Sequence, residues 1–114
     1  MSTLFNEAVN IGEENYTYWG FNLGYQAGVD LSVRVSPDWV GVDVYAMTKS
    51  EFKNFKRGNI FKHFPGLHCE NSISFNGSEV LPPGSYNIVV KNSNRWYDGQ
   101  DNIARVSMRL DILR

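Results

Sequence analysis

The sequence predicts an all-β fold, an antiparallel β-sandwich (jelly-roll-like) of seven or eight strands with one short helix near residues 49–57. Apolar and polar residues alternate with a period of two along most of the chain, which is typical of strands that have one buried and one solvated face. Turn-forming residues separate these runs at short intervals. The 114 residues, 42% of them hydrophobic, are enough for one core, so we expect a single β-sandwich domain over residues 1–114.

The clearest alternation lies at 29–35 and 40–46, and the turn signal Ser36-Pro37-Asp38 between these runs predicts that they pair as consecutive antiparallel strands. Because strands with polar outer faces bury one face only, two stacked sheets are the expected arrangement. In order along the chain, strands are expected at 8–11, 15–23, 29–35, 40–46, 71–75, 86–90 and 104–112.

The predicted core is made of the apolar residues on one face of each strand. A polar loop at 92–102 is expected to separate the last two strands. The core residues are Val29, Leu31, Val33, Val35, Val40, Val42, Val44, Ile73, Phe75, Tyr86, Ile88, Val90, Val106, Met108, Leu110 and Ile112.

One segment breaks the alternation and predicts a short helix. Thr48 followed by Glu51 is a capping-box pattern, in which the threonine caps the first turn. Phe52 and Phe55 share one helical face, and Gly58 provides a left-handed stop. A helix this short is not stable alone, so we expect the two phenylalanines to anchor it to the sandwich.

Two longer runs resemble a known family. They are VDVYAMTKSEFKNFKRG at 42–58 and LPPGSYNIVVKNSN at 81–94. Together they resemble the Golgi-dynamics (GOLD) and bacterial pre-peptidase C-terminal type of small β-sandwich, over roughly 29–112. The resemblance implies a non-catalytic module with protein or lipid partners, although this chain lacks the cysteine pair of the lumenal eukaryotic members.

Charge and apolar runs exclude several classes of protein. Lys and Arg number 11 against 12 Asp and Glu, for a net charge of −1, which argues against a general nucleic-acid binder. No apolar run approaches the roughly 18 residues of a membrane span. The start of the chain lacks the features of a secretory signal, and a single cysteine excludes an internal disulfide, so we expect a cytoplasmic protein.

The segment from His63 to Glu70 gathers the ligand types of zinc, because it also holds His68 and Cys69. Only one histidine spacing of the zinc type occurs, so a surface loop is the favoured interpretation. Binding of a divalent metal by His63 and His68 is a weaker hypothesis. No base is positioned for Cys69, and no phosphate-binding glycine motif occurs. We therefore expect no enzyme, no cofactor and no metal site.

The first candidate interaction surface is a basic stretch around the predicted helix. Its expected binding residues are Lys53, Lys56 and Arg57, joined by Lys49 and Lys62 and opposed by one acidic residue. Such a surface suits an anionic membrane or an acidic partner. The competing interpretation is that these residues form the solvated face of the helix.

Aromatic residues give the second candidate. Trp96 and Tyr97 lie in the polar loop beside Asp98 and Asp101, and Trp39 precedes an expected strand. In their expected strands, Tyr16, Tyr18 and Tyr45 alternate with the apolar residues and so lie on the opposite face. Exposed aromatic rings stack on sugars, and neighbouring carboxylates accept hydrogen bonds from hydroxyl groups. The sequence thus predicts a non-catalytic module that binds a protein or membrane partner, or self-associates, with carbohydrate binding as the alternative.

Overall fold

The computed structural model describes residues 2–12, 14–36, 40–92 and 103–113. The predicted sandwich of seven or eight strands with one short helix is confirmed, and the described residues form eight strands, one α-helix and one 3-10 turn, η1. The elements are β1 (Ser2–Ile11), β2 (Tyr16–Leu23), β3 (Ala27–Ser36), β4 (Val42–Thr48), α1 (Lys49–Lys56), η1 (Pro65–Leu67), β5 (Cys69–Ser72), β6 (Ser74–Leu81), β7 (Gly84–Asn92) and β8 (Ala104–Leu113).

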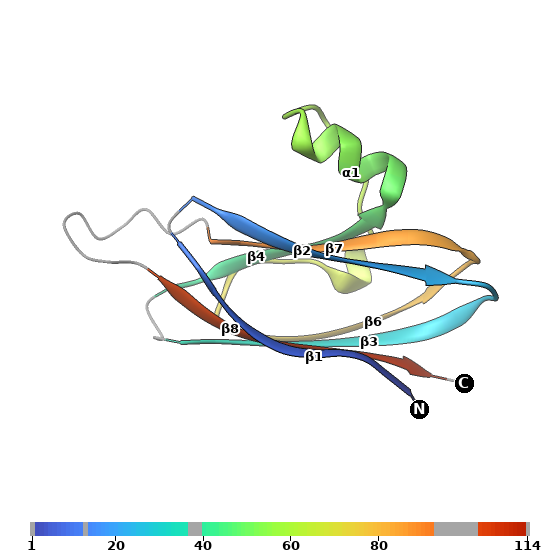
Figure 1. Ribbon diagram of the computed structural model, residues 1–114, viewed down its shortest axis with the longest axis horizontal. Coiled ribbons are helices and arrows are strands. Elements are labelled where there is room, and N and C mark those ends of the chain that lie inside the picture. Colours follow the sequence, from blue (N-terminus) through green and yellow to red (C-terminus); the bar gives the residue numbers. More distant parts are fainter. Residues whose placement is uncertain (1, 13, 37–39, 93–102, 114) are drawn as a thin grey trace.

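The strands form two stacked sheets of four, with the orders β1-β8-β3-β6 and β2-β7-β4-β5 (Figure 1). All pairs are antiparallel. Strands at the same position in the two sheets are consecutive in the chain: β1 with β2, β8 with β7, β3 with β4, and β6 with β5. This arrangement is that of a jelly roll, in which the chain crosses between the layers at almost every connection.

The expected pairing of the runs 29–35 and 40–46 is wrong. β3 pairs with β6 and β8, whereas β4 pairs with β5 and β7, so the two strands lie in different sheets. Alternation determines which face of a strand is buried, but it carries no information about which strand lies beside it. The turn signal between the runs marks a crossing from one sheet to the other.

Most of the predicted core is buried between the sheets; Val29, Leu110 and Ile88 have no exposed surface. Ile73 is an exception, with 41% of its surface exposed, and Val35 and Phe75 are only half-buried. The segment 71–75 is not one strand, because β5 ends at Ser72 and β6 begins at Ser74. Ile73 occupies the bend between them, where the alternation of faces is interrupted.

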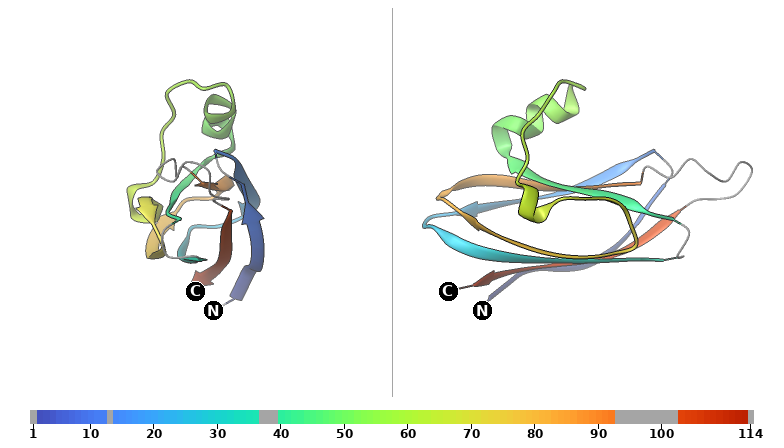
Figure 2. Two further views of the ribbon diagram at one scale, coloured as in Figure 1. Left: turned by 90° about the vertical axis from the view of Figure 1, so that its left-hand side faces the viewer. Right: turned by 180° about the vertical axis from the view of Figure 1, so that it is seen from behind.

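A second apolar cluster lies on the outer face of the β2-β7-β4-β5 sheet. It consists of the buried residues Met47, Phe52 and Val89, with Tyr45 and Phe55 packed around them. α1 covers this part of the sheet (Figures 1 and 2). Phe52 therefore anchors the helix as expected, and the outer face of this sheet is not uniformly polar.

The predicted helix signals are largely present. Thr48 Oγ1 accepts a hydrogen bond of 3.2 Å from the amide of Glu51. At the other end Gly58 has a φ of 74°, and the amide of Asn59 donates to the carbonyl of Asn54 at 2.9 Å. With the bond of 3.1 Å from Gly58 to the carbonyl of Phe55, this is a Schellman motif. No helix in the described ranges combines the length and the apolar character needed to cross a bilayer.

Candidate functional site

The candidate site is the surface made by α1, the following segment 57–64 and the outward side chains of β2 and β4, which we call the helix face. α1 and this segment protrude from the outer side of the β2-β7-β4-β5 sheet (Figure 2). The helix begins directly after β4, so its first turn is fixed to the sheet by covalent continuity. The segment returns to the sheet at Phe64, whose amide donates a hydrogen bond of 2.9 Å to the carbonyl of Ala46.

An aromatic layer joins the helix, the segment and the sheet. The ring centroids of Tyr18 and Phe52 lie 4.6 Å apart, and those of Tyr16 and Phe55 lie 5.0 Å apart. Phe61 packs edge-on against Phe55 and against Tyr45, at 5.2 Å in both cases. Because the layer draws on all three parts of the helix face, it holds the protruding segment in a defined position.

The tyrosines of this layer differ in exposure. Tyr16 is 39% and Tyr18 is 51% exposed beside the helix. Tyr45 is half-buried, because Phe61, His63 and His68 pack around its ring. Burial raises the pKa of Tyr45. Tyr45 faces away from the main core, as its position in the strand predicts. It packs into the second apolar cluster, so its ring does not form an open stacking surface.

The predicted binding residues Lys53, Lys56 and Arg57 are brought together on the helix face, and all three are exposed, as are Lys49 and Lys62. None of these five forms an ion pair with another described residue. The Nζ atom of Lys56 lies 4.9 Å from the ring centroid of Phe52. The five basic side chains therefore present a net positive charge to solvent, which Glu51 beside Lys62 offsets only in part.

The acidic residue of this region, Glu51, accepts hydrogen bonds from within the helix face. Glu51 Oε1 accepts hydrogen bonds from Asn54 Nδ2 at 3.0 Å and from the amide of Lys62 at 3.2 Å. These two bonds lower the pKa of Glu51. The carboxylate reaches forward to the segment 57–64 instead of back to the Thr48 amide, so the predicted capping box is only half formed.

The turn after the helix carries an apolar residue that the sequence analysis missed. Ile60 is 96% exposed, and it lies between Arg57 and Lys62 in the sequence. The segment that follows α1 forms the end of the protrusion (Figure 2). In the sequence Ile60 is only an isolated aliphatic residue two positions after Gly58, within a basic stretch.

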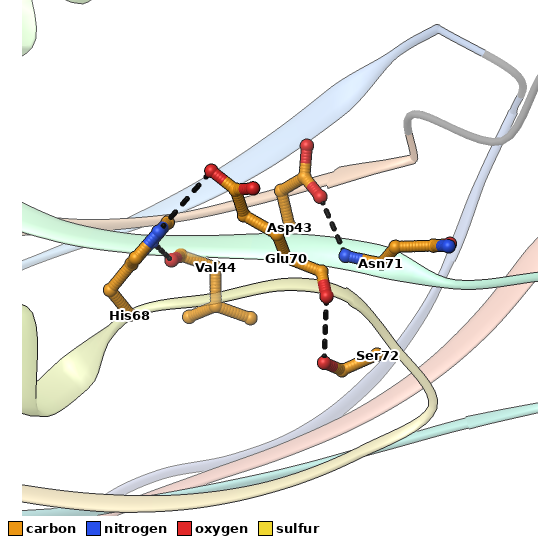
Figure 3. A network of polar contacts seen from close by, with 6 residues as sticks. All are labelled: Asp43, Val44, His68, Glu70, Asn71 and Ser72. Carbon is orange, nitrogen blue, oxygen red and sulfur yellow. Dashed lines mark hydrogen bonds and ion pairs between the residues drawn. The ribbon is translucent and has the colours of Figure 1, made fainter.

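His63 and His68 also come together, with ring centroids 4.4 Å apart. His68 Nδ1 lies 2.8 Å from the carbonyl oxygen of Val44, and its Nε2 lies 3.5 Å from Glu70 Oε1 (Figure 3). His63 is exposed, but partial desolvation by the neighbouring rings lowers its pKa, and His68 lowers it further. No set of three or more His, Cys, Asp or Glu side chains positioned for a metal occurs among the described residues.

Polar contacts hold the edge strand β5 beside β4, and Cys69 lies at its start. Asp43 Oδ1 of β4 accepts from the amide of Asn71 at 2.8 Å, whereas the bond of 3.0 Å from the Ser72 hydroxyl to the carbonyl of Glu70 lies within β5 (Figure 3). Cys69 is half-buried, and burial raises the pKa of its thiol. A raised pKa keeps the thiol protonated and weakens it as a nucleophile.

A pocket of about 360 Å³ opens beside the first turn of α1. Part of its wall is the Glu51–Lys62 contact. It is lined by Thr48, Glu51, Lys62, His63 and Phe64. The lining residues join the helix to the returning segment, so the pocket belongs to the helix face.

Five predicted site residues are not placed by the structure. Trp39, Trp96, Tyr97, Asp98 and Asp101 lie outside the described residues. Their part in carbohydrate binding remains a prediction from the sequence.

No protein-family model matches this chain, and no curated protein matches it either. Among solved structures, the pre-peptidase C-terminal domain of a collagenase from Bacillus anthracis is similar. It has 18% sequence identity and a TM-score of 0.57, covering 90% of this chain and 88% of that domain. This likeness shows the fold and supports the pre-peptidase C-terminal part of the predicted resemblance. Similarity to Golgi-dynamics domains stays a prediction.

Two carbohydrate-binding modules are more distant. The CBM36-1 domain of a multidomain xylanase from the hindgut metagenome of Trinervitermes trinervoides has 12% identity and a TM-score of 0.43, covering 100% of this chain and 90% of that one. A CBM36 module in complex with calcium and xylotriose has 11% identity and a TM-score of 0.40, covering 99% and 93%. At this distance they add nothing to the description of the fold.

Proposed function

We propose that this chain is a non-catalytic interaction module that binds an anionic partner through the helix face. The observation that carries the proposal is the exposure of Lys49, Lys53, Lys56, Arg57 and Lys62 around a fixed aromatic layer, while the carboxylate of Glu51 is occupied internally.

The distribution of charge supports this proposal more than the total charge does. The chain has a net charge of −1, yet the helix face presents five cations in 14 positions of sequence, 49–62. Clustered charge of one sign attracts an oppositely charged partner over about one Debye length, roughly 8 Å at physiological salt. Binding through this face should therefore weaken steeply as salt is added.

The chemistry of the described residues agrees with a binding role. The thiol of Cys69 has a raised pKa, and His68 turns toward Val44 and Glu70. A nucleophile is activated by a base within hydrogen-bonding distance, by a lowered pKa or by a metal. We therefore favour a binding role over catalysis at Cys69 and His68.

Self-association is less well supported than a separate partner. Two copies that met through their helix faces would bring Lys53, Lys56 and Arg57 of each close to the same residues of the other. Like charges at close range oppose association. The carbohydrate alternative depends on residues outside the described ranges and remains a second prediction.

The test is binding to an immobilised poly-L-glutamate probe over a series of salt concentrations. We expect retention at low salt, weakening steadily with added salt. Lys53→Glu should reduce the affinity about fivefold or more, on the basis of about 1 kcal/mol per cation at an anionic surface. The matched control is Arg105→Glu on β8, which makes the same change of charge on the other sheet. Equal loss in the two variants, or no retention at all, would contradict the proposal.

A further inference from the structure

We infer that the anionic partner of the helix face is a lipid bilayer, into which Ile60 inserts while the surrounding basic side chains contact the lipid headgroups. This inference rests on the proposed function and names the partner. It follows from the position of Ile60, the fixed turn that carries it and the charges on either side.

Ile60 is the most exposed of the large hydrophobic residues described, at 96%. An aliphatic side chain in water is unfavourable relative to an apolar environment. The same side chain in the acyl boundary of a bilayer removes apolar surface from water. Ile60 is therefore available to insert into a bilayer that the surrounding basic residues bring close.

The turn that presents Ile60 is fixed at both ends. On the helix side, the Schellman motif joins Asn59 to Asn54 at 2.9 Å and Gly58 to Phe55 at 3.1 Å. On the other side, the Phe61 ring packs against Phe55 and Tyr45. A turn that is already ordered loses little conformational entropy when it binds.

Basic residues surround this apolar tip. Lys56 and Arg57 precede it and Lys62 follows it, and all three are exposed. Their long aliphatic stems can lie along the acyl boundary while the charged ends stay among the phosphates. Each contributes attraction to an anionic leaflet, and together they direct the tip toward its surface.

A bilayer fits this geometry better than an acidic protein does. Protein interfaces derive most of their affinity from a central anchor held in a complementary pocket of the partner, within a contiguous buried patch. Here a single aliphatic side chain, Ile60, is almost fully exposed between basic residues of the sequence, in the segment that protrudes from the sheet (Figure 2). A fluid bilayer accepts such a tip without a preformed pocket.

The test is co-sedimentation with phosphatidylcholine vesicles containing about 30% phosphatidylserine, compared with vesicles of phosphatidylcholine alone. Ile60→Ser should lower the partition coefficient on the anionic vesicles about tenfold, since the buried aliphatic surface is lost. Ile60→Trp should keep or raise it, because tryptophan favours the membrane interface. The matched control is Val80→Ser, which removes an aliphatic residue 62% exposed on β6 of the opposite sheet.

Poly-L-glutamate separates this inference from the proposed function. Ile60→Ser should bind that probe as the unmodified chain does, whereas Lys53→Glu should weaken binding to both poly-L-glutamate and anionic vesicles about fivefold or more. If Ile60→Ser and Val80→Ser partition equally onto the vesicles, Ile60 does not insert and the inference is overturned. Retention on poly-L-glutamate without vesicle binding would also overturn it, and would identify an acidic macromolecule as the partner while leaving the proposed function intact.

Discussion

The carboxylate of Glu51 and the backbone amide of Lys62 are joined by a hydrogen bond of 3.2 Å across 11 positions of sequence. The bond links the first turn of α1 to the segment that returns from its end. Asn54, one turn further along the helix, donates a second bond to the same oxygen at 3.0 Å. The acidic residue of the basic stretch thus holds the protrusion together, and its ionised carboxylate offsets one of the five positive charges around it.

Replacing Glu51 by Ala should loosen the segment 57–64 without unfolding the sandwich. The amide of Lys62 loses its acceptor, so its hydrogen exchange should become faster. The pKa of Glu51 is lowered from 4.5 in the fold, so its contribution to stability is present above that pH and is lost as the pH falls through the folded pKa. Glu51→Ala should therefore lose less stability on acidification than the unmodified chain.

Glu7→Ala on β1 is the matched control, because it removes an exposed carboxylate from the opposite sheet. It should leave exchange of the Lys62 amide unchanged. Unaltered exchange in Glu51→Ala as well would show that the bond does not hold the segment.

Gly58→Ala should destabilise the end of α1 through backbone conformation alone. Gly58 has a φ of 74°, and an added Cβ would meet no atom within 4 Å. The expected loss is about 1 kcal/mol, typical of a non-glycine residue in the left-handed region. Gly58→Asn should lose less, because asparagine tolerates this region better. Denaturant unfolding of both variants measures the difference, and equal losses would contradict the explanation.

The sequence alone predicted the architecture because the sandwich is built from local patterns. Alternation identified the buried face of β3, β4, β7 and β8, and the cap at Thr48 and the stop at Gly58 bounded the helix. It did not predict strand order, since β3 and β4 carry the same pattern and lie in different sheets. Pairing depends on contacts between distant segments, which periodicity does not encode.

Only the local part of the candidate site was predicted, because contacts between distant segments leave no pattern in the sequence. The basic residues of the helix were found because they are neighbours in sequence. The aromatic layer was not found, because it joins Tyr18 of β2 to Phe52, and Tyr45 of β4 to Phe61. Ile60 was missed because an isolated aliphatic residue carries no pattern, and only its exposure of 96% in the fold distinguishes it.

Phe52→Ala should destabilise the protein more than Phe55→Ala does. Phe52 is 4% exposed and packs with Met47 and Val89, whereas Phe55 is only half-buried. Truncation of a buried phenylalanine lowers the free energy of unfolding by about 3–5 kcal/mol. We expect a value in this range for Phe52→Ala and a clearly smaller one for Phe55→Ala, measured by denaturant unfolding. Equal losses would mean that the helix is not anchored through Phe52.

Stability should also depend on pH through His63. Its ring packs against Tyr45 and Phe61 and lies 4.4 Å from the ring of His68 between centroids. Burial and then the charge of His68 lower its pKa from 6.5, while Glu70 acts in the opposite direction. The folded state therefore binds the proton on His63 less well than the unfolded state does. The contribution of neutral His63 to stability is complete above pH 6.5 and is lost as the pH falls through the folded pKa.

His63→Gln should therefore reduce the loss of stability between about pH 7 and about pH 5, the range in which histidine titrates. Glutamine keeps a polar side chain at the edge of Tyr45 but cannot become charged, so the difference between the two unfolding curves isolates the histidine. His68→Gln is a less specific comparison, because it also removes the contacts with Val44 and Glu70. If stability depends on pH in the same way in the unmodified chain and in His63→Gln, the prediction is wrong. Protonation of His63 would then not oppose the packing of the returning segment against β4.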